Sequence, residues 1–251
     1  MERAEWLKKI KLQAERLYDQ IAPTYWDRWG CETDDVHQRF IDLFLERLPG
    51  NSSLLDAACG AGLYDGMLLQ AGHRVLGIDQ SAGMLARARE HYPAERFPRL
   101  EYRRLPMQAM DFQAEFEGII CMDAMEHICP EDWPGIVSRF AQALKPGGVF
   151  YVTVEEPDWE EVRQSYENAV AQGLPVVYGE IADKLEASFE RIARLDVRTA
   201  SMEQLDESDP AVYHYYPSPE QVRQWFEQNG LALEEEVGHG KWYAHFLLRK
   251  K

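Results

Sequence analysis

Between residues 53 and 154 the sequence alternates short apolar runs with amphipathic segments, and this alternation is its strongest constraint on the fold. The apolar runs predict strands at 53–57, 74–78, 100–104, 118–122 and 149–154. The segments between them predict helices at 63–70, 81–91 and 133–144. The last run, Val149 to Val154, is too apolar to face water on either side. That is typical of a parallel sheet with helices on both faces, so we expect a doubly wound α/β fold.

The segments on either side of this alternation predict further helices and two closing strands. We expect an amphipathic helix at 2–17 that ends before Pro23, and a second at 36–48 that Pro49 stops. Near the carboxyl end, Ser218 is expected to cap a helix that ends at Asn229 and Gly230. Strands at 231–237 and 242–249 flank the hairpin sequence Gly238-His239-Gly240, which brings the mostly parallel sheet to seven strands.

A charged stretch interrupts the pattern after Pro157. We expect a helix at 158–172, a short apolar run at 174–178 and another helix that reaches about Leu195. This stretch has the character of an insertion between the fifth strand and the helix at Ser218.

Charge and composition exclude several classes of protein. The chain of 251 residues has 27 lysines and arginines against 43 acids, a formal net charge of −16, which disfavours binding to nucleic acid phosphates. Its apolar runs are far shorter than the ~20 residues of a membrane span, and its amino end lacks a secretory signal, so we expect a cytoplasmic protein. The cysteines are scattered, which argues against a zinc site and against disulfides; they are residues 31, 59, 121 and 129.

The segment at 54–62, LLDAACGAG, predicts a strand that enters a glycine-containing turn before a helix. At Gly60 and Gly62 the absence of side chains would let the backbone approach a ligand closely. Asp79 ends the second predicted strand, where it could bind both hydroxyls of a ribose. The dinucleotide fingerprint fails, because Asp65 occupies the third glycine position, and Asp56 would oppose a pyrophosphate. Asp56 could instead bind an ammonium group, so an adenosine joined to an amino acid fits better.

These segments resemble the class I S-adenosylmethionine-dependent methyltransferase family. The resemblance covers the segments at 54–62, 75–81, 118–128 and 144–148, together with an upstream Y-D-x-x-A-x-x-Y segment at 18–25 that is similar to small-molecule members. It implies S-adenosylmethionine as cofactor, S-adenosylhomocysteine as product and a small-molecule methyl acceptor. The cofactor-binding residues implied are Tyr18, Tyr25, Asp56, Ala58, Gly60, Gly62, Asp79, Gln80, Met84, Met107, Gln108, Cys121 and Met122. The chain departs from the family pattern at 105–108, LPMQ, where an acid usually contacts adenine, and at Ala58, where glycine is frequent.

Residues for the acceptor side follow the fourth predicted strand. His127 is the candidate general base, or else a residue that caps the next helix, and Glu126 could orient it or bind an amine. The aromatic residues Tyr25, Trp26 and Trp29 form either a lid over the sulfonium or ordinary core. The segment 214–216 either lines the acceptor pocket or forms an ordered loop, whereas His239 and His245 are expected to be structural.

The resemblance divides the chain into four parts. We expect a helical lid at 1–50, a cofactor-binding core at 51–156, a helical cap over the acceptor site at 157–215, and a helix with two antiparallel strands at 216–251. Alternative functions remain an NAD(P)-dependent oxidoreductase, a non-catalytic cofactor-binding protein, and a protein or RNA methyltransferase. Either a monomer or a homodimer is compatible with the sequence.

Overall fold

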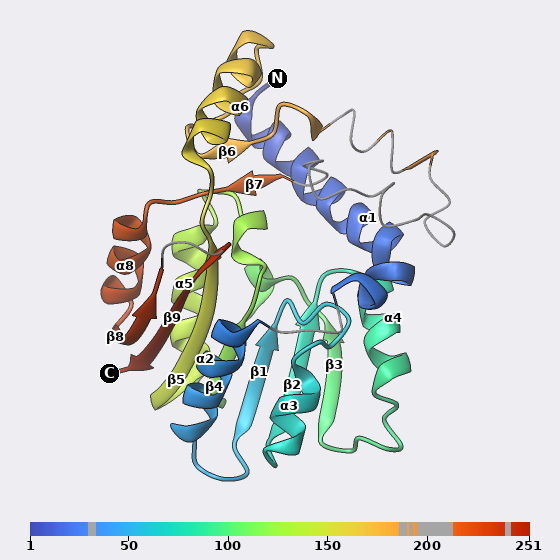
Figure 1. The fold of residues 1–251 in the computed structure, drawn as a ribbon, viewed down its shortest axis with the longest axis vertical. Coiled ribbons are helices and arrows are strands. Elements are labelled where there is room, and N and C mark those ends of the chain that lie inside the picture. Colours follow the sequence, from blue (N-terminus) through green and yellow to red (C-terminus); the bar gives the residue numbers. More distant parts are fainter. Residues whose placement is uncertain (30–33, 186–189, 191–192, 195–212, 239–241) are drawn as a thin grey trace.

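The fold centres on one seven-stranded sheet, which a computed structural model describes for residues 1–29, 34–185, 190, 193–194, 213–238 and 242–251 (Figure 1). The strand order is β3-β2-β1-β4-β5-β9-β8, and only β9 runs antiparallel to its neighbours. The strands are β1 (Ser53–Ala57), β2 (Arg74–Asp79), β3 (Leu100–Arg104), β4 (Phe116–Cys121), β5 (Leu144–Glu155), β8 (Leu231–Val237) and β9 (Tyr243–Lys250). This confirms the predicted mostly parallel, doubly wound sheet.

Helices cover both faces of the sheet, as the alternation predicted. On one face α5 (Trp133–Ala143) and α8 (Pro219–Gln228) pack against one set of strand side chains, which includes Leu55, Ile119 and Phe150. On the other face α2 (Asp35–Glu46) and α3 (Asp65–Gln70) pack against the alternate set, which includes Leu54 and Ile120. Consecutive residues of a strand thus point to opposite faces of the sheet, and helices cover both faces. The helix α4 (Ala82–His91) packs beside β2 and β3.

The predicted end of the first helix before Pro23 is wrong. Helix α1 spans Arg3–Trp29 and continues through Pro23. A proline within a helix removes one backbone hydrogen bond. Packing outweighs that loss here, because Leu17, Ile21 and Ala22 on one side of α1 are buried against α4 and the turn after β1. Burial against the rest of the protein therefore keeps this segment in one helix, although the local sequence predicts an end at the proline.

The other boundaries lie close to the predicted ones. The strand β5 begins at Leu144, at the end of the predicted helix, and residues 145–148 form a turn that interrupts its pairing with β4, with Gly147 in the left-handed region at φ +76°. Ser218 caps α8 by accepting a hydrogen bond from the backbone N–H of Gln221 at 3.2 Å. The expected hairpin turn at 239–240, including His239, lies outside the described residues.

The segment after β5 packs against the beginning of α1. It contains α6 (Trp159–Ala171) and a two-stranded pair, β6 (Glu180–Ile181) with β7 (His214–Tyr215). The predicted helix that reaches Leu195 lies largely outside the described residues. Trp6 and Ile10 of α1 are buried against Ala182, Leu185 and their neighbours. An ion pair joins the same two segments, with Arg3 Nη2 2.6 Å from Oε1 of the buried Glu180.

Two observations bear on the composition arguments. In the described part of the chain, no helix is both long and apolar enough to cross a membrane. The cysteines at 59, 121 and 129 are buried and free, and Cys31 lies outside the described residues.

Candidate functional site: a cofactor pocket at the carboxyl ends of the strands

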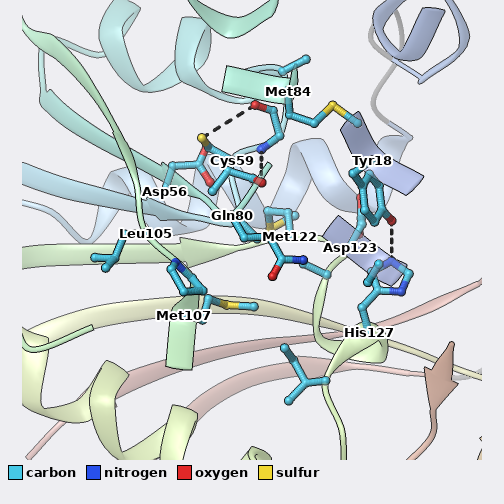
Figure 2. Close-up of a pocket in the computed structure, with 18 of the residues that line it drawn as sticks. Tyr18, Asp56, Cys59, Gln80, Met84, Leu105, Met107, Met122, Asp123 and His127 are labelled. Carbon is cyan, nitrogen blue, oxygen red and sulfur yellow. Dashed lines mark hydrogen bonds between the residues drawn. The ribbon is translucent and has the colours of Figure 1, made fainter. Parts of the chain in front are cut away.

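A cavity opens where β1, β2 and β4 end, and helix α1 closes one side of it (Figure 2). The space inside it and at its opening to solvent is together about 1030 Å³. Most of the predicted cofactor residues line it. They are Tyr18, Tyr25, Asp56, Ala58, Gly60, Asp79, Gln80, Met84, Met107, Gln108 and Met122, joined by the predicted base His127.

The turn after β1 leaves room for a ligand. Gly60 has φ +53°, in the left-handed region that favours glycine, and a Cβ added there would meet no atom within 4 Å. Ala58 also lies in that region, at φ +59°, which explains why glycine is frequent at this position in similar sequences. The backbone of this turn thus forms an open cradle at the edge of the sheet.

Asp79 is tied to that turn by backbone hydrogen bonds. Its Oδ2 accepts from the Gly60 N–H at 3.0 Å, and its Oδ1 accepts from the Ser81 N–H at 2.7 Å. Burial raises its pKa to about 6, although these hydrogen bonds favour the carboxylate. A carboxylate has about four acceptor positions, and the backbone of Gly60, Gln80 and Ser81 uses up to three of them, so at least one remains for a ligand hydroxyl.

Asp56 and Asp65 form a buried pair of carboxyl groups. Burial, and then the charge of Asp65, raises the pKa of Asp56, while burial raises the pKa of Asp65 to about 6. Asp65 also accepts a hydrogen bond from Tyr102 Oη at 2.5 Å. The Oδ2 atom of Asp56 is buried and accepts no hydrogen bond from an N–H or hydroxyl of the described residues, while Asp56 and Asp65 share a side-chain hydrogen bond when one of them is protonated. A cationic group in the pocket would satisfy this oxygen and favour its charged form, as the ammonium of a methionine moiety would.

The remaining cofactor residues form mainly an apolar wall. Met84 lies at the start of α4 and packs against α1, and Met122 follows β4. Met107 is buried, and its Sδ is 3.7 Å from the Cys121 Sγ. The Gln108 amide donates to Asp132 at 3.2 Å, which fixes its position at the rim. The apolar side chains can pack against a flat ring such as adenine, at the position where the family resemblance would place an acidic residue.

Three predicted site residues lie outside the pocket. A Cβ on Gly62 would be 2.6 Å from the Tyr102 hydroxyl oxygen, so this glycine is required for packing. Cys121 is fully buried beneath Met107, and burial raises the pKa of its thiol. Glu126 is also buried, with its Oε2 lacking a described partner, and burial raises its pKa, followed by the charge of Glu155. Glu126 can therefore act on the pocket only through a neighbouring side chain.

The predicted aromatic lid is only partly present. Tyr25 lines the pocket, but Trp26 stacks on His91 with ring centroids 3.8 Å apart, and Trp29 is 38% exposed and packs on Tyr25. His245, as expected, is structural, with its Nδ1 2.9 Å from the Tyr151 hydroxyl oxygen.

His127 lies at the far wall in contact with Tyr18. The Tyr18 hydroxyl oxygen is 2.6 Å from His127 Nε2, and Figure 2 draws this hydrogen bond as a dashed line. On the other side of the ring, Nδ1 is 3.4 Å from the Tyr213 carbonyl oxygen. Burial lowers the pKa of His127 to about 4, so the imidazole is neutral at neutral pH. The predicted pair of Glu126 and His127 also exists, with Oε1 3.5 Å from Nε2.

The segment 214–216 supports this wall from behind. The His214 ring centroid is 4.9 Å from that of His127, and Tyr216 Oη donates to the Glu155 carboxylate at 3.1 Å. Burial raises the pKa of Glu155 to about 7. These residues do not line the cofactor pocket, and their predicted place beside the acceptor, or in an ordered loop, stays a prediction.

Asp123 and Lys11 are among the pocket residues that sequence reasoning missed. Asp123 has φ +50° and accepts hydrogen bonds from the hydroxyls of Tyr64, at 3.1 Å, and Thr153, at 2.9 Å. Its position directly after the fourth strand was the available signal. Lys11 reaches the pocket from α1 and pairs with Asp132 at 2.6 Å, a contact that no local pattern indicates.

Comparisons with known proteins agree with this geometry. Residues 54–148 match the family model of the methyltransferase domain. The ubiquinone biosynthesis O-methyltransferase of Acinetobacter baumannii (strain AYE) is 31% identical over 154 residues, which cover 58% of this chain and 63% of that protein. The corresponding enzyme of Hydrogenovibrio crunogenus is 32% identical over 146 residues, which cover 55% and 58% of the two chains. The matches thus span less than two thirds of these relatives.

Solved structures share the fold at low sequence identity. An S-adenosylmethionine-dependent methyltransferase from Mesorhizobium loti has a TM-score of 0.59 and 19% identity, over 83% of this chain and 96% of that one. The 1,6-didemethyltoxoflavin-N1-methyltransferase of Burkholderia thailandensis, solved with S-adenosylhomocysteine, has a TM-score of 0.60 and 15% identity, over 96% and 89% of the two chains. The chain therefore contains a segment, at 54–148, that matches the methyltransferase domain, and it shares the fold of these solved methyltransferases.

Proposed function

We propose that this protein transfers the methyl group of S-adenosylmethionine to a small-molecule acceptor. The observation that carries the proposal is the pocket at 56–62 and Asp79, in which an open backbone cradle, a ribose acceptor and a buried carboxyl oxygen lie together. Each of these features matches one part of an adenosine joined to a charged amino acid.

The roles of the pocket residues follow from their chemistry. Asp79 would hold the ribose hydroxyls, Asp56 would face the ammonium, and Met107 would lie against the adenine. The bound cofactor supplies an activated methyl group on a positively charged sulfur. Because that leaving group is already activated, the protein contributes mainly position and the exclusion of water.

A small acceptor suits the enclosure and the charge of the protein. Helix α1 covers one side of the pocket with Lys11, Tyr18 and Tyr25, and this enclosure favours a small acceptor. The net charge of −16 opposes a nucleic acid acceptor, and we propose a cytoplasmic enzyme. The relatives' names describe O-methyltransferases, which favours an acceptor hydroxyl. We further propose that the segment at 157–215 lies over the acceptor side and that His127 takes up the acceptor's proton.

Calorimetry and product analysis test this function directly. The protein should bind S-adenosylhomocysteine at micromolar concentrations and should not bind NAD or NADP. It should then form S-adenosylhomocysteine from S-adenosylmethionine with a catechol as acceptor. Binding of NAD(P) in place of S-adenosylhomocysteine would refute the assignment, and binding without turnover over a panel of phenols, amines and thiols would leave a cofactor-binding protein.

A further inference from the structure

The hydrogen bonds of His127 determine which of its nitrogens carries the proton. The Tyr213 carbonyl oxygen can only accept, so its 3.4 Å contact with Nδ1 favours the tautomer with the proton on Nδ1. In a neutral imidazole the other nitrogen, Nε2, is then an acceptor. The Tyr18 hydroxyl, 2.6 Å away, therefore donates its proton to Nε2.

This arrangement places Tyr18 between the pocket and His127. A hydroxyl that donates its proton still has two lone pairs, and Tyr18 lines the pocket. The Nε2 atom is already occupied by Tyr18, so an acceptor that enters the pocket meets the tyrosine oxygen. Glu126 Oε1 also lies 3.5 Å from Nε2.

We propose that Tyr18 and His127 form a two-step proton relay, in which Tyr18 is the catalytic residue that contacts the acceptor hydroxyl. The proposal rests on the proposed function. The acceptor O–H bond breaks and its proton passes to Tyr18 Oη, while the tyrosine proton passes to His127 Nε2. The acceptor oxygen uses its electron pair to bond the methyl carbon, and the electrons of the carbon–sulfur bond remain on sulfur. His127 later returns the proton to solvent.

The kinetic test compares acceptors that do and do not need to lose a proton. At about pH 8 catechol keeps most of its hydroxyl protons, whereas 4-nitrocatechol is largely ionised. Tyr18→Phe should lower kcat on catechol by roughly a hundredfold, the scale of general base catalysis, and leave the rate on nitrocatechol within about tenfold of the parent. His127→Gln should show the same selectivity. Tyr25→Phe, a second tyrosine of the same wall, should change both rates by a similar factor.

A spectroscopic test does not depend on turnover. Nitrogen-15 NMR of the imidazole should show His127 protonated on Nδ1, and Tyr18→Phe should shift the Nε2 resonance and raise the pKa of His127, because the neutral form loses a hydrogen bond. Equal losses on both acceptors, or a proton on Nε2, would overturn the relay. Absence of methyl transfer by the parent protein to any acceptor would refute the proposed function, and the NMR result would still decide the Tyr18–His127 geometry.

Discussion

Substitution of Gly60 by valine tests the cofactor pocket without a large change in the fold. A Cβ at this position meets no atom within 4 Å, so the cost in stability comes from the left-handed backbone at φ +53°. That conformation costs an L-residue roughly 1–2 kcal/mol. For a chain of this size we expect the Tm to fall by about 2–8 °C.

The effect on binding should be much larger than the effect on stability. The valine methyl groups would occupy the cradle beside Asp79, and we expect affinity for S-adenosylhomocysteine to fall by more than about 100-fold, which is about 2.7 kcal/mol. Titration calorimetry measures this loss, and thermal unfolding measures the strain.

A matched control separates strain from obstruction. Gly147 also has a left-handed φ, +76°, and open space around its Cβ, but it lies in the turn at the start of β5, away from the pocket. Gly147→Val should lower the Tm to a similar extent and leave S-adenosylhomocysteine binding unchanged. If Gly60→Val binds S-adenosylhomocysteine within about threefold of the parent, the cradle is not the cofactor site.

Three further substitutions probe the surrounding structure. Asp79→Ala should abolish S-adenosylhomocysteine binding in calorimetry and lower the free energy of unfolding by roughly 1–3 kcal/mol for each N–H left without an acceptor; parental affinity would contradict the ribose role. Gly83→Ala places a Cβ 3.0 Å from the backbone of Asp19, so it should push α1 from α4, cost about 1–3 kcal/mol in chemical denaturation and weaken S-adenosylhomocysteine binding; an unchanged unfolding curve would argue against this contact. Burial raises the pKa of Glu155 from 4.5 to about 7, so its ionisation costs stability as the pH rises through that window. In urea unfolding, the free energy of unfolding of Glu155→Gln should therefore rise by about 2 kcal/mol relative to that of the parent between about pH 5 and pH 8. If the difference between the two proteins does not change with pH, this carboxyl is solvated.

Much of the fold could be predicted because its signals are local. The strands at 100–104 and 231–237 have the bounds that their sequence patterns predict, since alternation and flanking turns mark both ends. The glycine turn and Asp79 were also recognisable, because residues at the ends of adjacent parallel strands converge at one edge of the sheet.

The rest depends on contacts between distant segments. Helix α1 continues past Pro23 only because α4 buries its other side, and the proline itself predicts an end. Tyr18 and His127 are 109 positions apart, so no spacing rule joins them. Glu126 was predicted beside the acceptor from its place in the motif. Its burial behind the pocket wall depends on Tyr243 and Glu155, which come from later strands.

The wall that α1 contributes to the pocket comes from a single helix. Four pocket residues belong to the same 27-residue helix: Lys11, Ala14, Tyr18 and Tyr25. A ligand that contacts them therefore binds only when α1 is docked against the pocket. Ligand occupancy and helix docking are therefore thermodynamically linked, and each favours the other by the same free energy. Saturation with S-adenosylhomocysteine should accordingly slow amide hydrogen exchange along α1, including turns that never meet the ligand.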